Sequence, residues 1–153
     1  MIKNITIFDL DGTVIDSSHR QLTKADGTLD IANWLANATP EKIFNDKLLP
    51  LAQQIGKRSK TDYTIICTAR NMTHADYEFL ADNGLGVDKI ISRKIGDNTP
   101  DGELKAKALK KLFNLKQFKK LNKIMFDDSP SVRKALRPLG ITVINPEKIQ
   151  ERI

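Results

Sequence analysis

Hydrophobic residues gather in five short runs, and the stretches between them carry apolar positions at helical spacing. The runs are near-continuous and rich in β-branched residues, which is typical of strands buried on both faces of a sheet. They span residues 5–8, 63–67, 89–91, 123–126 and 141–144. Strands that alternate with helices predict an α/β fold with a parallel five-stranded sheet, right-handed crossovers and helices on both faces.

The intervening stretches predict four helices. Shared apolar faces precede the second run (Leu48, Leu49, Ala52, Ile55), the third (Tyr77, Leu80, Ala81) and the fourth (Leu104, Ala108, Leu109, Leu112, Phe113). We expect Thr73 to cap the start of the second of these helices and Asn83-Gly84 to stop it. Ser129-Pro130 is a typical start for the last helix, which Gly140 closes.

The length and composition fit one compact domain. A chain of 153 residues is long enough to bury a core without a disulfide or a structural metal. Its single cysteine, Cys67, excludes an internal disulfide framework and a multi-cysteine zinc site. No apolar run reaches eighteen residues, and the N-terminal run breaks at Asp9 and Asp11, unlike a signal peptide. We therefore expect a single domain over residues 1–153 and a cytoplasmic protein without a membrane span.

The chain is basic, with a formal net charge of +6. This excess suits a protein that meets phosphates, and it equally suits plain solubility. The densest basic stretch is residues 105–123, which contains eight lysines: 105, 107, 110, 111, 116, 119, 120 and 123. We expect most of it to be a solvated helix face, with a track for a polynucleotide as the alternative.

Polar residues follow three of the predicted strands at the points where they end. Asp9 and Asp11 follow the first, Thr68 and Arg70 the second, and Asp127-Asp128 the fourth. The carboxyl ends of parallel strands face one edge of the sheet, where ligands bind. Two carboxylates about 4 Å apart repel by about 4 kcal/mol at an effective dielectric near 20, so the cluster predicts a cation. Hard oxygen ligands without histidine or cysteine favour Mg²⁺.

The spacing Asp9-Leu10-Asp11 places two carboxylates on one face of an extended segment. One can attack a phosphorus atom while the other handles a proton, and aspartates that form acyl-phosphates are an established class of nucleophile. Gly12 lets the backbone turn, and we expect its N–H to face a phosphate.

The sequence Asp9-Leu10-Asp11-Gly12-Thr13 resembles the first motif of the haloacid dehalogenase (HAD) phosphohydrolase superfamily. Thr68, Lys105 and Asp127-Asp128 resemble the second, third and fourth motifs, in order. The resemblance implies a Rossmann-like three-layer sandwich around a central parallel five-stranded sheet, with little or no cap. The polar stretch after the first strand then corresponds to an irregular flap or minimal cap at about residues 14–45.

A narrower resemblance joins further residues to these motifs. Ser18-His19-Arg20, Thr68-Ala69-Arg70, and Arg93 with Pro100-Asp101 ahead of Lys105 look like the phosphatase half of phage polynucleotide kinase. Those enzymes remove 3′-phosphates from nucleic-acid ends. That family often carries a second basic residue where this chain has Asn98-Thr99, which affects the expected substrate contacts there.

The resemblance implies a role for each motif residue. Asp9 is the expected nucleophile and a Mg²⁺ ligand, and Asp11 the acid–base residue, with its backbone carbonyl also on the metal. Thr68 is expected to hydrogen-bond the phosphoryl group and Lys105 to neutralise its charge. Asp127 is the expected direct metal ligand, with Asp128 binding directly or through water.

Several further residues are expected to contact the substrate. They are Gly12, Arg20, Arg70, Arg93 and Asp101. An arginine can clamp a phosphate through its bidentate fork. For Arg70 a surface ion pair is the alternative, and for His19 a substrate contact and a local loop hydrogen bond stay open.

These observations predict a Mg²⁺-dependent phosphomonoesterase with an aspartyl-phosphate intermediate. A short flap leaves the site open to a polymer end, so a 3′-phosphate on DNA or RNA is the leading substrate. A nucleotide or deoxynucleotide monophosphatase is the alternative enzyme, and a non-catalytic phosphate- or nucleic-acid-binding module the alternative class. No Gly-rich kinase loop is present, so any kinase or ligase step belongs to a separate partner.

Overall fold

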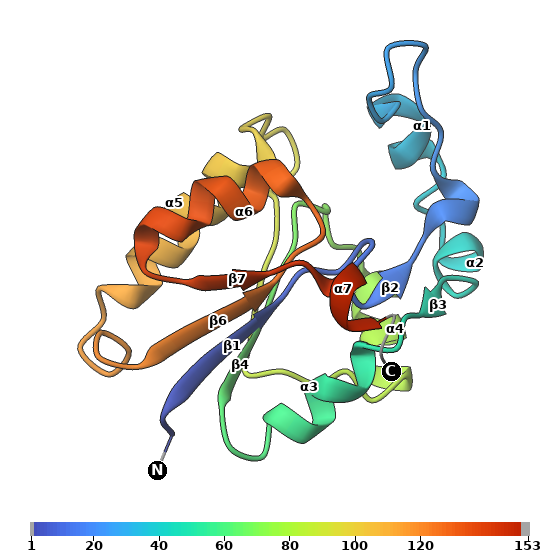
Figure 1. The fold of residues 1–153 in the computed structure, drawn as a ribbon. Coiled ribbons are helices and arrows are strands. Elements are labelled where there is room, and N and C mark those ends of the chain that lie inside the picture. Colours follow the sequence, from blue (N-terminus) through green and yellow to red (C-terminus); the bar gives the residue numbers. More distant parts are fainter. Residues whose placement is uncertain (1, 151–153) are drawn as a thin grey trace.

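A computed structural model describes residues 2–150 and shows a central parallel sheet with helices on both faces (Figure 1). The strand order is β5-β4-β1-β6-β7, and every neighbouring pair is parallel. The strands are β1 (Asn4–Phe8), β4 (Tyr63–Cys67), β5 (Lys89–Ile91), β6 (Asn122–Phe126) and β7 (Thr142–Ile144). The predicted α/β class and the five predicted strands are therefore confirmed.

The core lies in two layers on either side of the sheet. Helices α3 (Ala52–Arg58) and α4 (His74–Asp82) contribute to the first layer, which includes Phe8 and Ile66 of the strands. Helices α5 (Asp101–Phe113) and α6 (Pro130–Leu136) contribute to the second, which includes Ile7 and Ile65. Neighbouring residues of one strand thus point to opposite faces, which explains why the runs are apolar throughout.

The predicted helix boundaries hold where capping residues mark them. The Thr73 side chain accepts a hydrogen bond from the backbone N–H of Asp76, and the Asp76 carboxylate accepts one from the backbone N–H of Thr73. Asn83 ends α4. Ser129 caps α6. A short 3-10 helix, η2 (Arg137–Leu139), extends α6 to Gly140, whose φ of +79° suits glycine.

Two predicted helix faces are wrong. Leu48 and Leu49 both lie before α3. Leu48 belongs to strand β3 (Lys47–Leu48) and is 41% exposed. Pro50 separates it from the helix, which begins only at Ala52. Tyr77 is 46% exposed and Ala81 is also exposed, because α4 turns a different side to the sheet. The buried side of α4 contains Ala75, Asp76, Phe79 and Leu80.

The segment between β1 and α3, which we call the flap (residues 14–48), is more regular than expected. Strands β2 (Ile15–Asp16) and β3 pair antiparallel at its base. Between them lie η1 (Ser18–Arg20), α1 (Ile31–Ala36) and α2 (Pro40–Ile43). Figure 1 shows the flap projecting beyond the sheet, with α1 far from the strands. Asp30 and Thr39 cap α1 and α2, so local side-chain hydrogen bonds sustain these short helices.

The chain ends in α7 (Pro146–Gln150) after β7. Within residues 2–150, no helix combines the length and the apolar character that crossing a membrane requires.

Candidate active site

Three adjacent strands deliver the predicted motif residues to one edge of the sheet. The backbone N–H of Asp9 donates to the carbonyl of Phe126 at 3.0 Å, and that of Asp127 to Ile144 at 3.2 Å. The backbone N–H of Thr68 likewise donates to Ile91 at 2.9 Å. These residues continue the ladders of β1, β6 and β4, so they lie at the carboxyl edge, as expected.

Lys105 links the carboxylates that follow β1 and β6. Its Nζ lies 2.8 Å from Oδ1 of Asp9 and 2.8 Å from Oδ2 of Asp127. The Lys105 residue is only 3% exposed, although it belongs to the lysine-rich stretch. Both carboxylates keep its ammonium charged, since they raise the pKa of Lys105 against the opposing effect of burial. The other lysines of α5, at 107, 110 and 111, are exposed.

Asp9, Asp127 and Asp128 form an acidic cluster. Each can offer an oxygen atom, and the three atoms lie within 4.8 Å of one another. Burial raises the pKa of Asp9 well above its usual range, and Asp127 and Asp128 add to the effect while Lys105 opposes it. Burial and the charge of Asp127 also raise the pKa of Asp128. Lys105 balances only part of the negative charge of this set of hard oxygen donors, which therefore fits Mg²⁺.

Gly12 lies against this cluster. Its φ is +79°, and a Cβ atom at this position would lie 2.2 Å from Oδ2 of Asp128. Its N–H donates to the carbonyl of Ile15 at 2.9 Å, so the N–H is used within the turn. The expectation that this N–H faces a phosphate is therefore not met here. Gly12 instead provides the space that Asp128 occupies.

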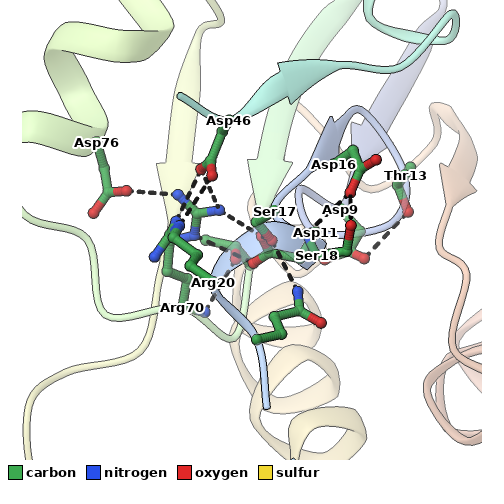
Figure 2. A network of polar contacts seen from close by, with 12 residues as sticks. Asp9, Asp11, Thr13, Asp16, Ser17, Ser18, Arg20, Asp46, Arg70 and Asp76 are labelled. Carbon is green, nitrogen blue, oxygen red and sulfur yellow. Dashed lines mark hydrogen bonds and ion pairs between the residues drawn. The ribbon is translucent and has the colours of Figure 1, made fainter. Parts of the chain in front are cut away.

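Asp11 is held by Arg70 rather than by the acidic cluster (Figure 2). Nη2 of Arg70 lies 2.5 Å from Oδ1 of Asp11, and Nε lies 3.2 Å from Oδ2. Ser17 also donates to Oδ1, at 2.6 Å. Burial alone would raise the pKa of Asp11, but the charge and hydrogen bonds of Arg70 outweigh it and hold this pKa below its ordinary value.

Two of the three arginines expected to bind substrate, Arg20 and Arg70, lie in one buried network (Figure 2). Nη1 of Arg70 donates to Asp76 at 2.6 Å. Arg20 donates two hydrogen bonds to the carboxylate of Asp46, from Nε at 3.0 Å and from Nη2 at 2.9 Å. Its third nitrogen, Nη1, is the one buried side-chain nitrogen or oxygen within residues 2–150 without a hydrogen-bond partner. His19 also contacts Asp46, at 2.7 Å, which is a contact 27 positions away rather than the local loop hydrogen bond considered for it.

Arg93 and Asp101 contact each other. Nη2 of Arg93 lies 2.7 Å from Oδ1 of Asp101, and its other nitrogens donate to the carbonyls of Ala69, Asp97 and Thr99. Arg93 thus ties the loop after β4 to the start of α5, the helix that carries Lys105. Thr68 is buried, and its hydroxyl accepts from the backbone N–H of Arg70 at 3.0 Å.

Sequence reasoning missed two carboxylates of this network. Asp76 could have been found, because Thr73-x-x-Asp76 fits the pattern of a helix capping box. Asp46 had no such signal, since it lies in a loop far from every motif. Cys67, the residue before Thr68, is buried, and burial raises the pKa of its thiol to about 12.

Comparisons with known proteins place the chain in a family. The sequence model described as bacteriophage T5 5′-deoxynucleotidase matches residues 1–153. The 5′-deoxynucleotidase of Escherichia phage T5 is 37% identical over 89 residues, which cover 55% of this chain and 36% of that protein. The chain thus spans little more than a third of this relative's length.

Solved structures share the fold at low sequence identity. A chain of the Pnkp1/Rnl/Hen1 RNA repair complex aligns with a TM-score of 0.62 and 20% identity, covering 94% of this chain and 42% of that one. A haloacid dehalogenase-like hydrolase from Streptococcus pneumoniae aligns with a TM-score of 0.59 and 14% identity, covering 99% and 98%. A HAD-superfamily hydrolase from Geobacter sulfurreducens gives 0.61 and 13%, covering 93% and 85%.

These neighbours confirm the HAD-like fold that the four motifs implied. The predicted class of enzyme, a phosphatase, agrees with the activity for which the matched family model is named. The family model and the phage relative are both named as 5′-deoxynucleotidases, and neither name mentions a 3′-phosphatase. The match along its whole length shows that the chain belongs to the bacteriophage T5 5′-deoxynucleotidase family.

Proposed function

We propose that the protein is a Mg²⁺-dependent 5′-deoxynucleotide monophosphatase that works through an aspartyl-phosphate on Asp9. The observation that carries the proposal is the contact of Lys105 with both Asp9 and Asp127, in a chain matched along its length by a 5′-deoxynucleotidase family. A buried carboxylate beside a cation, at the carboxyl edge of a parallel sheet, suits nucleophilic attack on a phosphate.

In the first half-reaction, a carboxylate oxygen of Asp9 attacks the phosphorus atom. The bond between phosphorus and the ester oxygen breaks, and the leaving oxygen takes a proton from Asp11 in its acid form. Lys105 supplies positive charge beside the phosphoryl oxygens as their negative charge develops. The hydroxyl of Thr68 donates a hydrogen bond to the same phosphoryl group.

In the second half-reaction, Asp11 is a carboxylate and takes a proton from water. The water oxygen attacks phosphorus, the bond to Asp9 breaks, and inorganic phosphate leaves with the Asp9 carboxylate restored. The contacts with Arg70 and Ser17 favour the carboxylate form of Asp11 that this step needs.

Asp9, Asp127 and Asp128 would hold Mg²⁺, together with the backbone carbonyl of Asp11. The ion, when bound, supplies positive charge that neutralises the phosphoryl oxygens. The donor set supports this assignment, because three carboxylates lie close together with only Lys105 to balance them.

A 3′-phosphate at a DNA or RNA end is the second candidate substrate. It is favoured by the pattern Ser18-His19-Arg20 with Thr68-Ala69-Arg70, which is similar to polynucleotide 3′-phosphatases. Arg20 is its remaining candidate contact, because Nη1 has no partner within residues 2–150. The family match ranks the free 5′-deoxynucleotide first.

Phosphate release in the presence of Mg²⁺ tests the proposal. The panel contains 5′- and 3′-deoxynucleoside monophosphates and oligonucleotides phosphorylated at either end. We expect the highest kcat/KM with a 5′-deoxynucleoside monophosphate, and no turnover after Asp9→Asn. Asp26→Asn is the matched control, because Asp26 is an exposed carboxylate of the flap that binds Thr28 locally. Equal turnover by Asp9→Asn would overturn the mechanism, and a preference for the 3′-phosphorylated oligonucleotide would favour the second candidate.

A further inference from the structure

We infer, resting on the phosphatase function proposed above, that Asp46 is a positioning residue that acts through Arg70 to hold Asp11 where it protonates the leaving group. Asp46 belongs to the flap, directly before β3, whereas Asp11 and Arg70 follow β1 and β4. The flap would then contribute to the chemistry of the site from within the protein rather than by contacting the substrate.

The carboxylate of Asp46 is surrounded by side-chain nitrogens of Arg20 and His19. It is 6% exposed as a residue, and it accepts hydrogen bonds from Nε and Nη2 of Arg20. His19 approaches it at 2.7 Å. Burying a carboxylate costs free energy unless polar or charged partners compensate for the lost water. These contacts therefore fix the position of the Asp46 carboxylate.

Arg70 connects Asp46 to Asp11. Its Nη2 lies 2.5 Å from Oδ1 of Asp11 and 3.6 Å from Oδ2 of Asp46, so one nitrogen faces both carboxylates. Nη1 is occupied by Asp76 at 2.6 Å. Arg70 is thus held by Asp76 of α4 and faces Asp46 of the flap. Its Nε and Nη2 atoms both contact Asp11.

The ring of Trp34 covers this connection. The guanidinium carbon of Arg20 lies 4.3 Å from the ring centroid, and that of Arg70 lies 5.6 Å from it. Trp34 is itself buried and belongs to α1 of the flap. The two guanidiniums therefore meet Asp46 in a surrounding that excludes water, where a charge pair constrains geometry more strongly than at the surface.

Loss of the Asp46 charge is expected to loosen Arg70 and, with it, Asp11. Nucleophilic attack by Asp9 needs none of these residues, so the defect should fall on the two proton transfers of Asp11. Only the first of them, protonation of the leaving group, depends on the substrate, because both substrates form the same aspartyl-phosphate. A nitrophenolate leaves without a proton, whereas a deoxyribose oxygen needs one. The ratio of kcat/KM for 5′-deoxynucleotide to kcat/KM for p-nitrophenyl phosphate isolates the effect, because kcat/KM contains only the steps through release of the leaving group.

The experiment measures this ratio for the parent protein and for Asp46→Asn. We expect the ratio to fall by about 10-fold in Asp46→Asn, which is part of the 10²–10⁴-fold that general acid catalysis typically supplies. KM for the deoxynucleotide should change little, because Asp46 does not touch substrate. An equal loss with both substrates would overturn the inference, since partial unfolding lowers both rates together.

Asp62→Asn is the matched control. Asp62 is also 6% exposed, accepts a hydrogen bond from the hydroxyl of Thr6 at 2.7 Å, and has Arg58 at 3.6 Å. It directly precedes β4, at the edge of the sheet opposite the site. Its substitution should lower both rates equally, if at all.

A double substitution tests the route through Arg70. In an Arg70→Gln background, Asp46→Asn should leave the ratio unchanged, because the connection is already broken. A further fall would contradict the role of Arg70. Where Asp46→Asn yields little folded protein, Asp46→Glu serves instead, since it keeps the charge but displaces it and should also lower the ratio. A parent protein inactive on both substrates would refute the proposed function, which is a different outcome.

Discussion

The Nζ of Lys105 lies 2.8 Å from Oδ1 of Asp9, although the two residues are 96 positions apart in the chain. The contact depends on α5, whose start is tied by Arg93 to the loop after β4. Lys105 is the only cation within 4 Å of the Asp9 and Asp127 carboxylates among the ion pairs of residues 2–150. The proposed nucleophile and its compensating charge thus come from segments that are far apart in the sequence.

Replacement of this cation should stop turnover without unfolding the protein. We expect Lys105→Met to lower kcat by about 10²–10³-fold, the usual loss when a preorganised charge or donor is removed. Steady-state phosphate release with a 5′-deoxynucleotide measures the effect, and circular dichroism checks the fold. Lys107→Met is the control, because Lys107 is exposed on the same helix. Comparable losses in both variants would mean that Lys105 acts only as a surface charge.

Gly12 should be irreplaceable for a steric reason. In Gly12→Ala, the new Cβ would lie 2.2 Å from Oδ2 of Asp128 and displace that carboxylate. We expect Mg²⁺-dependent activity to fall by at least 10-fold, because a displaced Asp128 should bind the metal more weakly. Changes around metal ligands typically lower metal affinity by this amount or more.

Gly27→Ala is the control that distinguishes the effect of the contact with Asp128 from the effect of backbone strain. Gly27 has a φ of +86°, close to the +79° of Gly12, but nothing lies within 4 Å of its Cβ position. Both variants carry a similar strain of about 1–2 kcal/mol. Titration of activity with Mg²⁺ compares them, and an unchanged Mg²⁺ requirement in Gly12→Ala would show that Asp128 is not held by this contact.

The strands and the site motifs could be predicted because their signals are local. Continuous apolar runs marked the sheet, and the polar residues at their ends came together because parallel strands share one edge. Thr73, Asn83 and Ser129 marked helix boundaries through hydrogen bonds within one turn.

The remaining features depend on contacts that no local pattern contains. Asp46 is essential to the network around Arg20 and Arg70, yet its partners lie 24 or more positions away. The exposure of Tyr77 follows from how α4 rotates against the sheet, which its few apolar residues do not determine. Arg70 was expected at the substrate, and only the structure shows the carboxylates that hold it.

Binding of Mg²⁺ should be visible without turnover. Three clustered carboxylates with raised pKa at Asp9 and Asp128 predict that the ion stabilises the folded protein, by about 2.7 kcal/mol at 100 times Kd. Protons compete for the same oxygens, so Mg²⁺ affinity should fall as the pH drops, beginning above the ordinary carboxyl range. Thermal unfolding at several Mg²⁺ concentrations and pH values measures both effects.

Asp127→Asn tests whether the cluster is responsible. The substitution keeps the shape of the side chain but removes a charge, and we expect the Mg²⁺-induced rise in Tm to disappear. Asp26→Asn, on the exposed flap, should keep it. A rise in Tm that survives in Asp127→Asn would place the ion elsewhere.

Without metal, Asp128 should weaken the folded state at neutral pH. Burial and Asp127 raise its pKa, so its contribution to stability is fully present below the unfolded pKa of about 3.9 and is lost as the pH rises through the folded value. We expect Asp128→Asn to raise the free energy of unfolding in EDTA at pH 8, with a gap that closes toward pH 4. Urea denaturation at both pH values measures it.

Asp97 provides the opposite case. Hydrogen bonds from the hydroxyl and N–H of Thr99 lower the pKa of Asp97, so its contribution is present above the unfolded pKa and is lost as the pH falls through the folded value. Asp97→Asn should therefore lower stability at pH 8, or leave it unchanged, where Asp128→Asn raises it. If both variants were destabilised alike at pH 8, repulsion within the Asp9–Asp127–Asp128 cluster would not be the cost that Mg²⁺ relieves.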